Sequence, residues 1–182
     1  MLELSLHILD IAENAVRAEA KTVAVTLIED SQADRLTLEI RDNGKGMTEN
    51  ELRRVLDPFY TTKKVRRVGL GLPMLAQAAQ NAGGNLEIES RPSEGTVVKV
   101  AFRLSHIDRQ PLGDLQGTLT TLIVGNPHTR FVYRHRRDQR EYVLDTDEIK
   151  NEIEDIPINH VEVLKFIRQD IAEGLNGINA QA

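Results

Sequence analysis

Two polar residues near the N-terminus have the spacing and chemistry of a metal and water site. Asp10 and Asn14 stand one helical turn apart in the segment 2–18, which has no glycine or proline and is predicted to be a helix. One sector of about 80° on that helix holds Glu3, His7, Asp10, Asn14 and Arg17. An ordinary solvent-facing stripe has the same pattern. In the functional interpretation, the Asn14 amide oxygen binds Mg²⁺ beside a nucleotide, and the Asp10 carboxylate orients or deprotonates a water.

The stretch Asp42-Asn43-Gly44-Lys45-Gly46-Met47 directly follows a predicted strand. Asn-Gly is a strong hairpin signal. However, Thr48 and Glu51 form a capping box, so a helix follows in place of a returning strand. The stretch can therefore line an adenine pocket, in which Asp42 accepts a hydrogen bond from the exocyclic amine of adenine. Its two glycines lack a Cβ and would let the backbone come close to the base.

The stretch Val68-Gly69-Leu70-Gly71-Leu72-Pro73-Met74 runs from a loop into a helix predicted over 70–81. Free backbone N–H groups at the start of a helix attract phosphate, and a proline is tolerated in the first turn. The stretch is not a P-loop, because no Gly-Lys-Ser/Thr follows. It is not a dinucleotide fingerprint either, because position 74 is methionine and no strand precedes it. A plain loop-to-helix junction would contain the same Gly-x-Gly.

A basic stretch lies between these two glycine clusters. It reads Asp57-Pro58-Phe59-Tyr60-Thr61-Thr62-Lys63-Lys64 and continues to Arg66 and Arg67. No hydrophobic period is visible, so a loop is predicted, and a solvated basic loop is one interpretation. The functional interpretation is a lid that closes over the nucleotide and brings Lys63, Lys64 or the two arginines near the terminal phosphates.

The alternation of apolar residues predicts the elements that must position these clusters. Period-two alternation predicts strands at 22–28, 36–40, 86–89 and 96–102. Helices are predicted at 2–18, 48–56 and 70–81. The order α-β-β-α-loop-α-β-β predicts an α+β fold, a two-layer sandwich with helices packed on one face of a sheet.

The chain changes character after about residue 104, so we predict one domain over 1–104 and a C-terminal extension over 105–182. Leucines at helical spacing predict a helix at 112–123, although the threonines between them also allow a strand. Residues 130–133 and 141–144 could pair as strands, and helices are predicted at 146–153 and 160–175. We expect a mixed α/β segment that forms a separate layer or small subdomain and serves docking or dimerisation.

The run from Arg134 to Arg140 offers a different function for the extension, because its cations could bind nucleic-acid phosphates. Acidic residues flank the run, Glu141 among them, and this favours a polar hairpin tip. The formal net charge of −5 also disfavours non-specific binding to nucleic acid. Nucleic acid is therefore not the expected partner.

Composition excludes several classes of protein. A chain of 182 residues with 40 % hydrophobic residues suits one domain with an appendage and a substantial core. Cysteine is absent, which excludes disulfides, thiolate metal sites and cysteine nucleophiles. There is no run of 18 apolar residues and no signal-peptide pattern, so we expect a cytoplasmic protein without a membrane span.

In this order and at this spacing, the clusters resemble the GHKL superfamily, which includes gyrase, heat-shock chaperone, histidine-kinase and mismatch-repair ATPase domains. The N box of that family resembles Leu9-Asp10-Ile11-Ala12-Glu13-Asn14-Ala15. Its two glycine boxes resemble residues 42–47 and Gly69-Leu70-Gly71-Leu72, and the histidine-kinase F box is similar to residues 57–63. Gly95-Thr96 matches the closing Gly-Thr of the family. The match covers roughly residues 1–104.

The resemblance implies a GHKL-type fold that binds ATP with Mg²⁺. It implies that Asn14 binds the metal and that Asp42 reads adenine with support from Thr96. Gly69 and Gly71 would face the phosphates. The remaining motif positions implied to contact ATP are Gly44, Gly46, Met47, Phe59, Thr61, Thr62, Lys63, Leu70 and Leu72.

Two departures from the family pattern bear on activity. In hydrolysing members the general base is a glutamate four residues before the Mg²⁺ asparagine. Here that position holds the shorter Asp10, and Glu13 has the wrong helical phase to replace it. The chain also begins at the N box, so we expect a stand-alone form without the hairpin that carries a phospho-acceptor histidine. His7 lacks that context and is interpreted as packing or hydrogen bonding locally.

Three activities remain open. The first is a phosphotransferase like the anti-sigma-factor serine kinases, and the second is a slow ATPase with Asp10 as base. In both, Lys63 and Lys64 are candidate catalytic cations. The alternative is a non-catalytic switch in which ATP changes the surface shown to a partner protein. The tail also resembles small stand-alone ATP-binding proteins of anaerobic bacteria, some encoded beside hydrogenase-type subunits, so a redox enzyme complex is a candidate partner.

Overall fold

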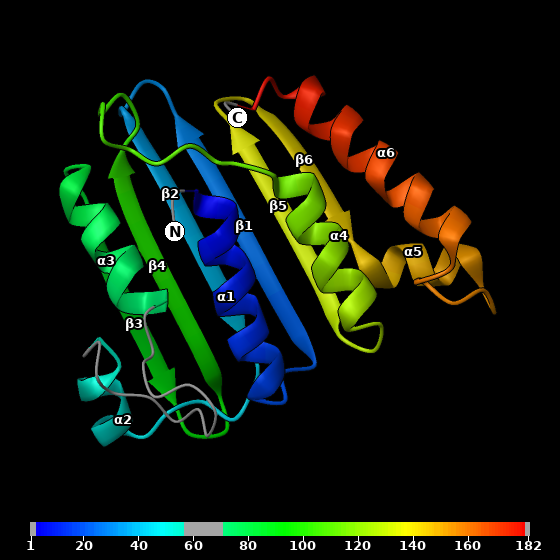
Figure 1. Ribbon diagram of the computed structural model, residues 1–182, viewed down its shortest axis with the longest axis horizontal. Coiled ribbons are helices and arrows are strands. Elements are labelled where there is room, and N and C mark those ends of the chain that lie inside the picture. The colour runs from blue at the N-terminus through cyan, green and yellow to red at the C-terminus, as the bar shows by residue number, and fades with distance from the viewer. Residues whose placement is uncertain (1–2, 57–70, 181–182) are drawn as a thin grey trace.

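The computed structural model describes residues 3–56 and 71–180 of the chain, and its centre is one six-stranded sheet (Figure 1). The strand order is β3-β4-β2-β1-β5-β6. The strands are β1 (Thr22–Asp30), β2 (Arg35–Asp42), β3 (Asn85–Arg91), β4 (Gly95–Arg103), β5 (Arg130–Arg137) and β6 (Arg140–Asp145). The helices are α1 (Leu4–Arg17), α2 (Glu49–Arg54), α3 (Gly71–Asn81), α4 (Leu115–Gly125), α5 (Thr146–Ile153) and α6 (Val161–Gly177).

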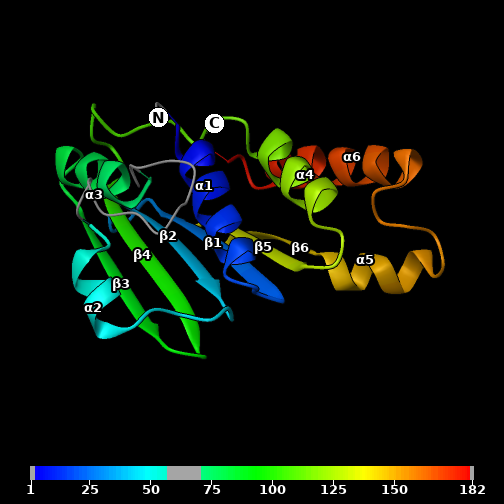
Figure 2. The ribbon, with the colours of Figure 1, turned by 60° about the horizontal axis from the view of Figure 1, so that its bottom comes forward.

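Helices α1, α3, α4 and α6 cover one face of the sheet (Figures 1 and 2). The burial of the strands agrees with this: along β1, Val23, Val25 and Leu27 are buried, while Ala24 and Thr26 between them are half-buried. Successive side chains of a strand point to opposite faces, so this alternation marks one covered and one uncovered side. The predicted α+β two-layer sandwich is confirmed.

The extension joins the sheet of the first segment. Strand β5 pairs in parallel with β1, from Thr22 opposite Arg130 to Glu29 opposite Arg137, whereas every other pair of neighbouring strands is antiparallel. The expected separate layer is therefore wrong, because β5 and β6 continue the existing sheet sideways. Parallel neighbours need a long crossover connection, which β2, β3, β4 and several helices provide here.

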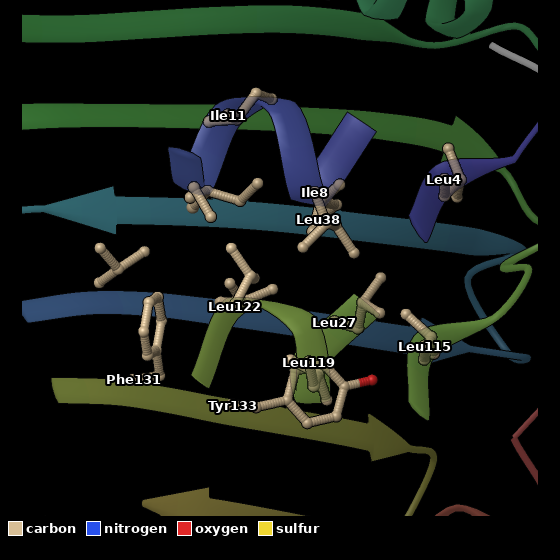
Figure 3. Close-up of a cluster of buried hydrophobic side chains, with 14 of the residues drawn as sticks. Leu4, Ile8, Ile11, Leu27, Leu38, Leu115, Leu119, Leu122, Phe131 and Tyr133 are labelled. Atoms are coloured by element: carbon tan, nitrogen blue, oxygen red, sulfur yellow. The ribbon is translucent and has the colours of Figure 1, made fainter. Parts of the chain in front are cut away.

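One continuous hydrophobic core underlies both segments (Figure 3). In the first segment, residues 1–104, α1 buries Ile8 and Ile11 against the sheet. On the extension, α4 buries Leu119 and Leu122, and Phe131 follows on β5. Of the segment 112–123, which also allowed a strand, residues 115–123 are helical, and the helix continues to Gly125.

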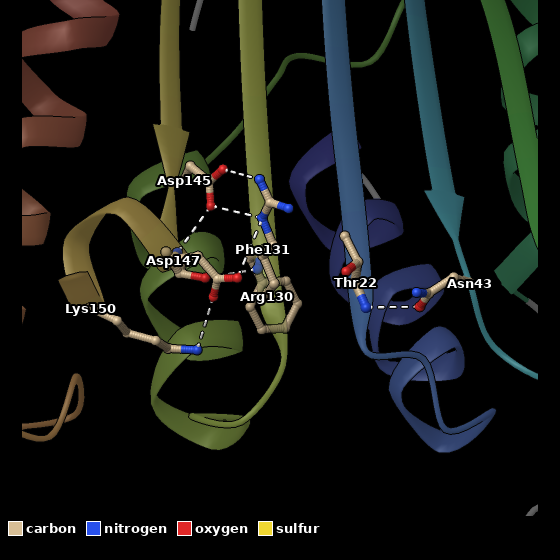
Figure 4. Close-up of polar contacts among 8 residues, drawn as sticks. Thr22, Asn43, Arg130, Phe131, Asp145, Asp147 and Lys150 are labelled. Atoms are coloured by element: carbon tan, nitrogen blue, oxygen red, sulfur yellow. Dashed lines mark hydrogen bonds and ion pairs between the residues drawn. The ribbon is translucent and has the colours of Figure 1, made fainter.

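A charged cluster ties the start of β5 to the end of β6 (Figure 4). The Arg130 Nε and Nη2 atoms donate to the two oxygens of Asp145, at 3.1 and 2.5 Å. Asp145 also caps α5, since its Oδ1 accepts from the backbone N–H of Asp147 at 3.0 Å. The Arg130 guanidinium holds the pKa of the Asp145 carboxyl below its ordinary value. Strand β6 is thereby fixed where it turns into α5.

Replacing Gly174 with alanine is expected to lower the free energy of unfolding by about 1–2 kcal/mol, because overpacking a core costs more than the gain in helix propensity. A Cβ at Gly174 on α6 would lie 2.1 Å from Cδ2 of Tyr142 on β6. The ring is held from its other end, since the Tyr142 hydroxyl donates to Asp170 at 2.7 Å. Urea unfolding followed by circular dichroism measures the effect.

Gly177 supplies the matched control for that change. It ends the same helix, and a Cβ built there meets nothing within 4 Å. Alanine at Gly177 should be neutral or slightly stabilising. Equal stabilities for the two variants would show that α6 does not pack closely on Tyr142.

Candidate nucleotide site

The polar stripe of α1 brings Asp10 and Asn14 together on the side of the helix away from the core. The Asn14 Nδ2 atom donates to Asp10 Oδ2 at 3.4 Å, and its Oδ1 atom accepts from Arg17 Nη2 at 2.7 Å. Both Asp10 and Asn14 are half-buried. The amide is thus oriented with its nitrogen toward a carboxylate and its oxygen toward a cation.

The start of α3 lies directly against this stripe. A Cβ added to Gly71 would fall 1.9 Å from Asp10 Oδ2 and 3.0 Å from its Cγ. A side chain at this position would require the Asp10 carboxylate to move, so glycine lets the backbone of α3 lie directly against it. The structure therefore joins Asp10 to the second glycine cluster, although sixty residues separate them in the chain.

The first glycine stretch docks on the other end of α1. The backbone N–H of Lys45 donates to the Ala18 carbonyl oxygen at 2.9 Å, and a Cβ at Gly44 would lie 2.7 Å from that same oxygen. Asn43 anchors the stretch to β1, because its Oδ1 accepts from the backbone N–H of Thr22 at 2.8 Å (Figure 4). The same oxygen accepts from the backbone N–H of Lys21, also at 2.8 Å. Asn14 lies between the two places where the glycine stretches meet α1.

Asp42 ends β2 on the helix-covered face of the sheet. Its Oδ1 accepts from the Gly44 backbone N–H at 2.8 Å. Burial raises the pKa of the Asp42 carboxyl, and the backbone N–H groups of Gly44 and Thr96 oppose that shift. Thr96 stands directly opposite Asp42 on the neighbouring strand. A partly desolvated acceptor with its neighbours in place suits a hydrogen bond to an uncharged donor on a base.

Ser90 holds this end of the sheet together and carries no signal in the sequence. Its hydroxyl accepts from the backbone N–H of Met47 at 2.8 Å, donates to the Gly95 carbonyl at 2.9 Å and lies 2.8 Å from the Thr96 hydroxyl. A serine at the end of an alternating strand is too common to stand out. A hollow at this end of the sheet is lined by Asp42, Ser90 and Thr96, and also by residues of the uncovered face, among them Thr22, Ala24, Arg41 and Val97.

Several residues expected to contact ATP lie outside the described residues. These are Phe59, Thr61, Thr62, Lys63, Lys64, Gly69 and Leu70. Of the remaining expected positions, the side chain of Leu72 packs against the hydrophobic core, so a contact with nucleotide would come from its backbone. The described part of the site therefore consists of the α1 stripe, the first glycine stretch, Thr96 and the start of α3.

His7 is buried and makes a local contact, as expected. Its Nε2 atom lies 3.1 Å from Gln110 Oε1, and burial lowers the pKa of the imidazole. The segment around Gln110 also receives hydrogen bonds from the start of α1, because the Leu4 and Ser5 backbone N–H groups donate to the carbonyls of Pro111 and Leu112. His7 thus fastens α1 to the segment that leads into the extension.

The side chains of the basic run in the extension lie on both faces of the sheet. Arg134 and Arg136 point to one face of the sheet and Arg137 to the other, since side chains alternate along a strand. Arg134 Nη1 lies 3.3 Å from Glu141 Oε1, and Arg137 Nε lies 3.9 Å from Glu29 Oε2. This arrangement favours the interpretation of a polar hairpin over a continuous phosphate-binding surface.

Within the described parts of the chain, no group of three or more His, Asp and Glu side chains has the geometry of a metal site. Within residues 3–56 and 71–180, no helix combines the length and the apolar character needed to cross a membrane.

Comparison with known families gives one match over the first segment. The family described as "Histidine kinase-, DNA gyrase B-, and HSP90-like ATPase" matches residues 2–106. Sporulation kinase C of Bacillus subtilis is 32 % identical over 96 residues, which are 53 % of this chain and 22 % of that protein. The sensor histidine kinase YxdK of the same organism is 33 % identical over 97 residues, which are 50 % of this chain and 30 % of that protein. The chain therefore spans less than a third of either relative.

Solved structures match the fold over more of the chain. The N-terminal domain of a DNA repair protein superposes with a TM-score of 0.58 at 15 % identity, covering 97 % of this chain and 59 % of that one. The Aquifex aeolicus MutL ATPase domain complexed with ADP superposes with a TM-score of 0.53 at 17 % identity, covering 85 % and 68 %. At these low identities the superpositions establish a shared fold alone, and the first covers nearly the whole chain, the extension included.

Proposed function

Because the chain belongs to the histidine kinase-, DNA gyrase B- and HSP90-like ATPase family, we propose that it binds Mg-ATP along α1 and transfers or hydrolyses the γ-phosphate in a regulatory role. The adenine would lie near Asp42 and Thr96. The phosphates would lie toward the start of α3. The proposed nucleotide domain is residues 1–104.

One observation supports this proposal more than any other. A Cβ at Gly71 would displace the Asp10 carboxylate, and a Cβ at Gly44 would lie too close to the Ala18 carbonyl oxygen, two helical turns further along α1. Both glycine stretches thus bring bare backbone to one helix, on either side of Asn14. A nucleotide bound there would meet an acceptor for its base at one end and backbone N–H groups for its phosphates at the other.

Asn14 suits Mg²⁺ because its amide oxygen already faces a cation, the Arg17 guanidinium at 2.7 Å. Amide and carboxylate oxygens are the hard ligands that Mg²⁺ prefers, and phosphate oxygens and water complete its shell in nucleotide sites. Bound Mg²⁺ would neutralise charge on the phosphates. Arg17 would then release the Asn14 oxygen, and it keeps a second partner in Glu13, at 3.3 Å.

The chemistry assigned to this chain is positioning and proton transfer. Asp10 would accept the proton of a water, or of a hydroxyl on an acceptor protein, as that oxygen forms its bond to the γ-phosphorus. The bond between the γ-phosphorus and its bridging oxygen breaks, and ADP leaves. Lys63 and Lys64 are proposed to stabilise charge on the transferred group. The acceptor is water in an ATPase and a protein side chain in a kinase.

The extension, residues 105–182, is proposed as the surface that docks a protein partner or a second copy of the chain. Its β5 pairs directly with β1 of the nucleotide segment, and its α4 packs beside α1. A change in α1 on binding ATP would therefore reach it through direct contacts. The same contacts would serve the alternative function, an ATP-dependent switch without catalysis.

ATP labelled on its γ-phosphate separates these activities. Free labelled phosphate would identify an ATPase, and label on a protein would identify a kinase. Tight binding of ATP without either labelled product would favour the non-catalytic switch. Absence of heat on mixing folded protein with Mg-ATP in a calorimeter would refute the proposal itself.

Replacing Asp10 with asparagine is expected to reduce phosphate release or transfer about 100-fold or more, because general-base catalysis contributes at least that factor. Affinity for Mg-ATP should change by less than about threefold, since the amide keeps the size of the carboxylate. Single-turnover rates and calorimetry measure the two quantities.

Glu13→Gln is the control, because it changes a carboxylate on the same helix whose described partner is Arg17. It should retain the parental rate. An Asp10→Asn protein that turns over at the parental rate would eliminate the proton-transfer role of Asp10.

A further inference from the structure

Ser90, Thr96 and Asp42 form a row across three neighbouring strands at the end of the sheet. Asp42 stands opposite Thr96 in the β2–β4 pair, and Thr96 stands opposite Ser90 in the β3–β4 pair. Residues directly opposite each other in antiparallel strands share a face. All three side chains therefore point to the helix-covered face, where the adenine is proposed to lie.

The single proton of the Ser90 hydroxyl fixes the direction of the hydrogen bonds in this row. The Gly95 carbonyl, at 2.9 Å, can only accept, so Ser90 donates to it. The Met47 backbone N–H, at 2.8 Å, can only donate, so it occupies one lone pair of Ser90. The Thr96 hydroxyl, at 2.8 Å, must then donate to the remaining lone pair.

Because its proton is used in the bond to Ser90, the Thr96 hydroxyl can only accept in any further hydrogen bond. Ionised Asp42 beside it is likewise an acceptor. The end of the sheet thus presents two acceptors and no side-chain donor from this row. A 6-amino group, with two N–H donors, complements them, whereas a 6-carbonyl group would place its own lone pairs against them.

We propose that Ser90 is a positioning residue that holds the Thr96 hydroxyl as an acceptor, so that this end of the sheet selects purine nucleotides with a 6-amino group. The inference rests on the proposed function, because it requires the base to bind at Asp42 and Thr96. Ser90 acts through Thr96 and does not touch the nucleotide. Asp42 supplies part of the selectivity on its own.

The experiment compares three Mg-nucleotides by calorimetry: ATP, inosine triphosphate and purine riboside triphosphate, which has no group at position 6. In the parental protein ATP should bind most tightly and inosine triphosphate least. In Ser90→Ala the Thr96 hydroxyl is free to rotate and donate. The ATP to inosine triphosphate affinity ratio should then fall about tenfold, the equivalent of one hydrogen bond.

A merely structural role for Ser90 predicts a different pattern. Loss of the Met47 contact alone would weaken all three nucleotides by the same factor and leave their ratios unchanged. Ser90→Thr keeps the hydroxyl and should restore the parental ratio. Ser105→Ala is the matched control, since its hydroxyl donates to Asp34 at 2.8 Å beyond the other end of β4.

Thr96→Val provides a second test if Ser90→Ala fails to fold. It removes the hydroxyl that contacts the base and leaves the Ser90 bonds to Met47 and Gly95, so the same ratio should fall. An unchanged ratio in the folded variants overturns the role of Ser90. Failure of the parental protein to bind any of the three nucleotides overturns the proposed function instead.

Discussion

Alanine at Gly46 is expected to abolish detectable Mg-ATP binding and to lower the free energy of unfolding by about 2–4 kcal/mol. Gly46 has φ of +65°, a conformation that L side chains adopt only with strain. A Cβ there would lie 1.9 Å from the carbonyl oxygen of Arg91 and 3.1 Å from that of Gly95. Both neighbours are backbone, so no side-chain rotation can relieve the contact.

Hydrogen bonds on either side of Gly46 would carry the effect of this clash to the proposed adenine pocket. The Ser93 backbone N–H donates to the Lys45 carbonyl at 2.8 Å, and the Met47 N–H donates to Ser90 at 2.8 Å. Moving the stretch away from the β3–β4 hairpin would break both. Asp42 would then lose its place opposite Thr96, and with it the proposed contact to the base.

Gly125→Ala is the control for this substitution. Gly125 lies at the end of α4, and a Cβ built there meets nothing within 4 Å. That variant should bind Mg-ATP like the parental protein. Calorimetry and urea unfolding of the two variants give the comparison. Parental affinity in Gly46→Ala would show that the stretch does not form the pocket.

Leucine at His135 is expected to lower the free energy of unfolding by about 3–5 kcal/mol, because it breaks a buried pair and leaves its carboxylate behind. His135 is 0 % exposed and Glu29 is 1 % exposed. The His135 Nε2 atom lies 2.8 Å from Glu29 Oε1, and its Nδ1 atom lies 2.9 Å from the Tyr133 hydroxyl. Leucine can replace neither contact.

This pair also joins the nucleotide segment to the extension, since Glu29 is on β1 and His135 on β5. Arg137 Nε lies 3.9 Å from the other oxygen of Glu29, Oε2, which is a longer contact than that of His135. Loss of His135 should therefore loosen the β1–β5 join first. Hydrogen exchange of the β5 amides measures that local effect beside the global stability.

Two variants test the cause of this loss. Adding Glu29→Met to His135→Leu removes the carboxylate that His135 contacted. The double variant should regain about 1–4 kcal/mol of the free energy of unfolding, since apolar groups of similar volume often replace a buried pair well. His128→Leu, at an exposed histidine before β5, should stay within about 0.5 kcal/mol of the parent. A His135→Leu protein as stable as the parent would contradict the prediction.

The helices and strands of residues 1–104 could be predicted because the sequence patterns that specify them are local. Alternation of apolar residues located β1 and β2, and the Thr48–Glu51 capping box forms as expected, with both hydrogen bonds present. Helix α3 ends at Asn81, just before Gly83, whose φ is +67°. Capping, glycine conformation and periodicity all act within a few residues, so a single chain displays them.

The sequence also indicated several residues of the candidate site, but it did not show how they come together in space. Asp10, Asn14 and Asp42 stand out by type and spacing. Ser90 does not, because its importance lies in contacts to Met47 and Thr96 rather than in any pattern around it. Sequence periodicity likewise indicated β5 and β6 but not their place beside β1, because pairing partners a hundred residues apart leave no local trace.

By itself, then, the sequence determined the order of helices and strands, the two glycine stretches and the family to which they belong, since each depends on short-range spacing. Tertiary structure decided that Gly71 meets Asp10, that the extension continues the sheet through β5, and that Glu29 lies within hydrogen-bond distance of His135. These contacts join residues that are distant in the chain. They arise only when burial of one shared core brings α1, the sheet and the extension together.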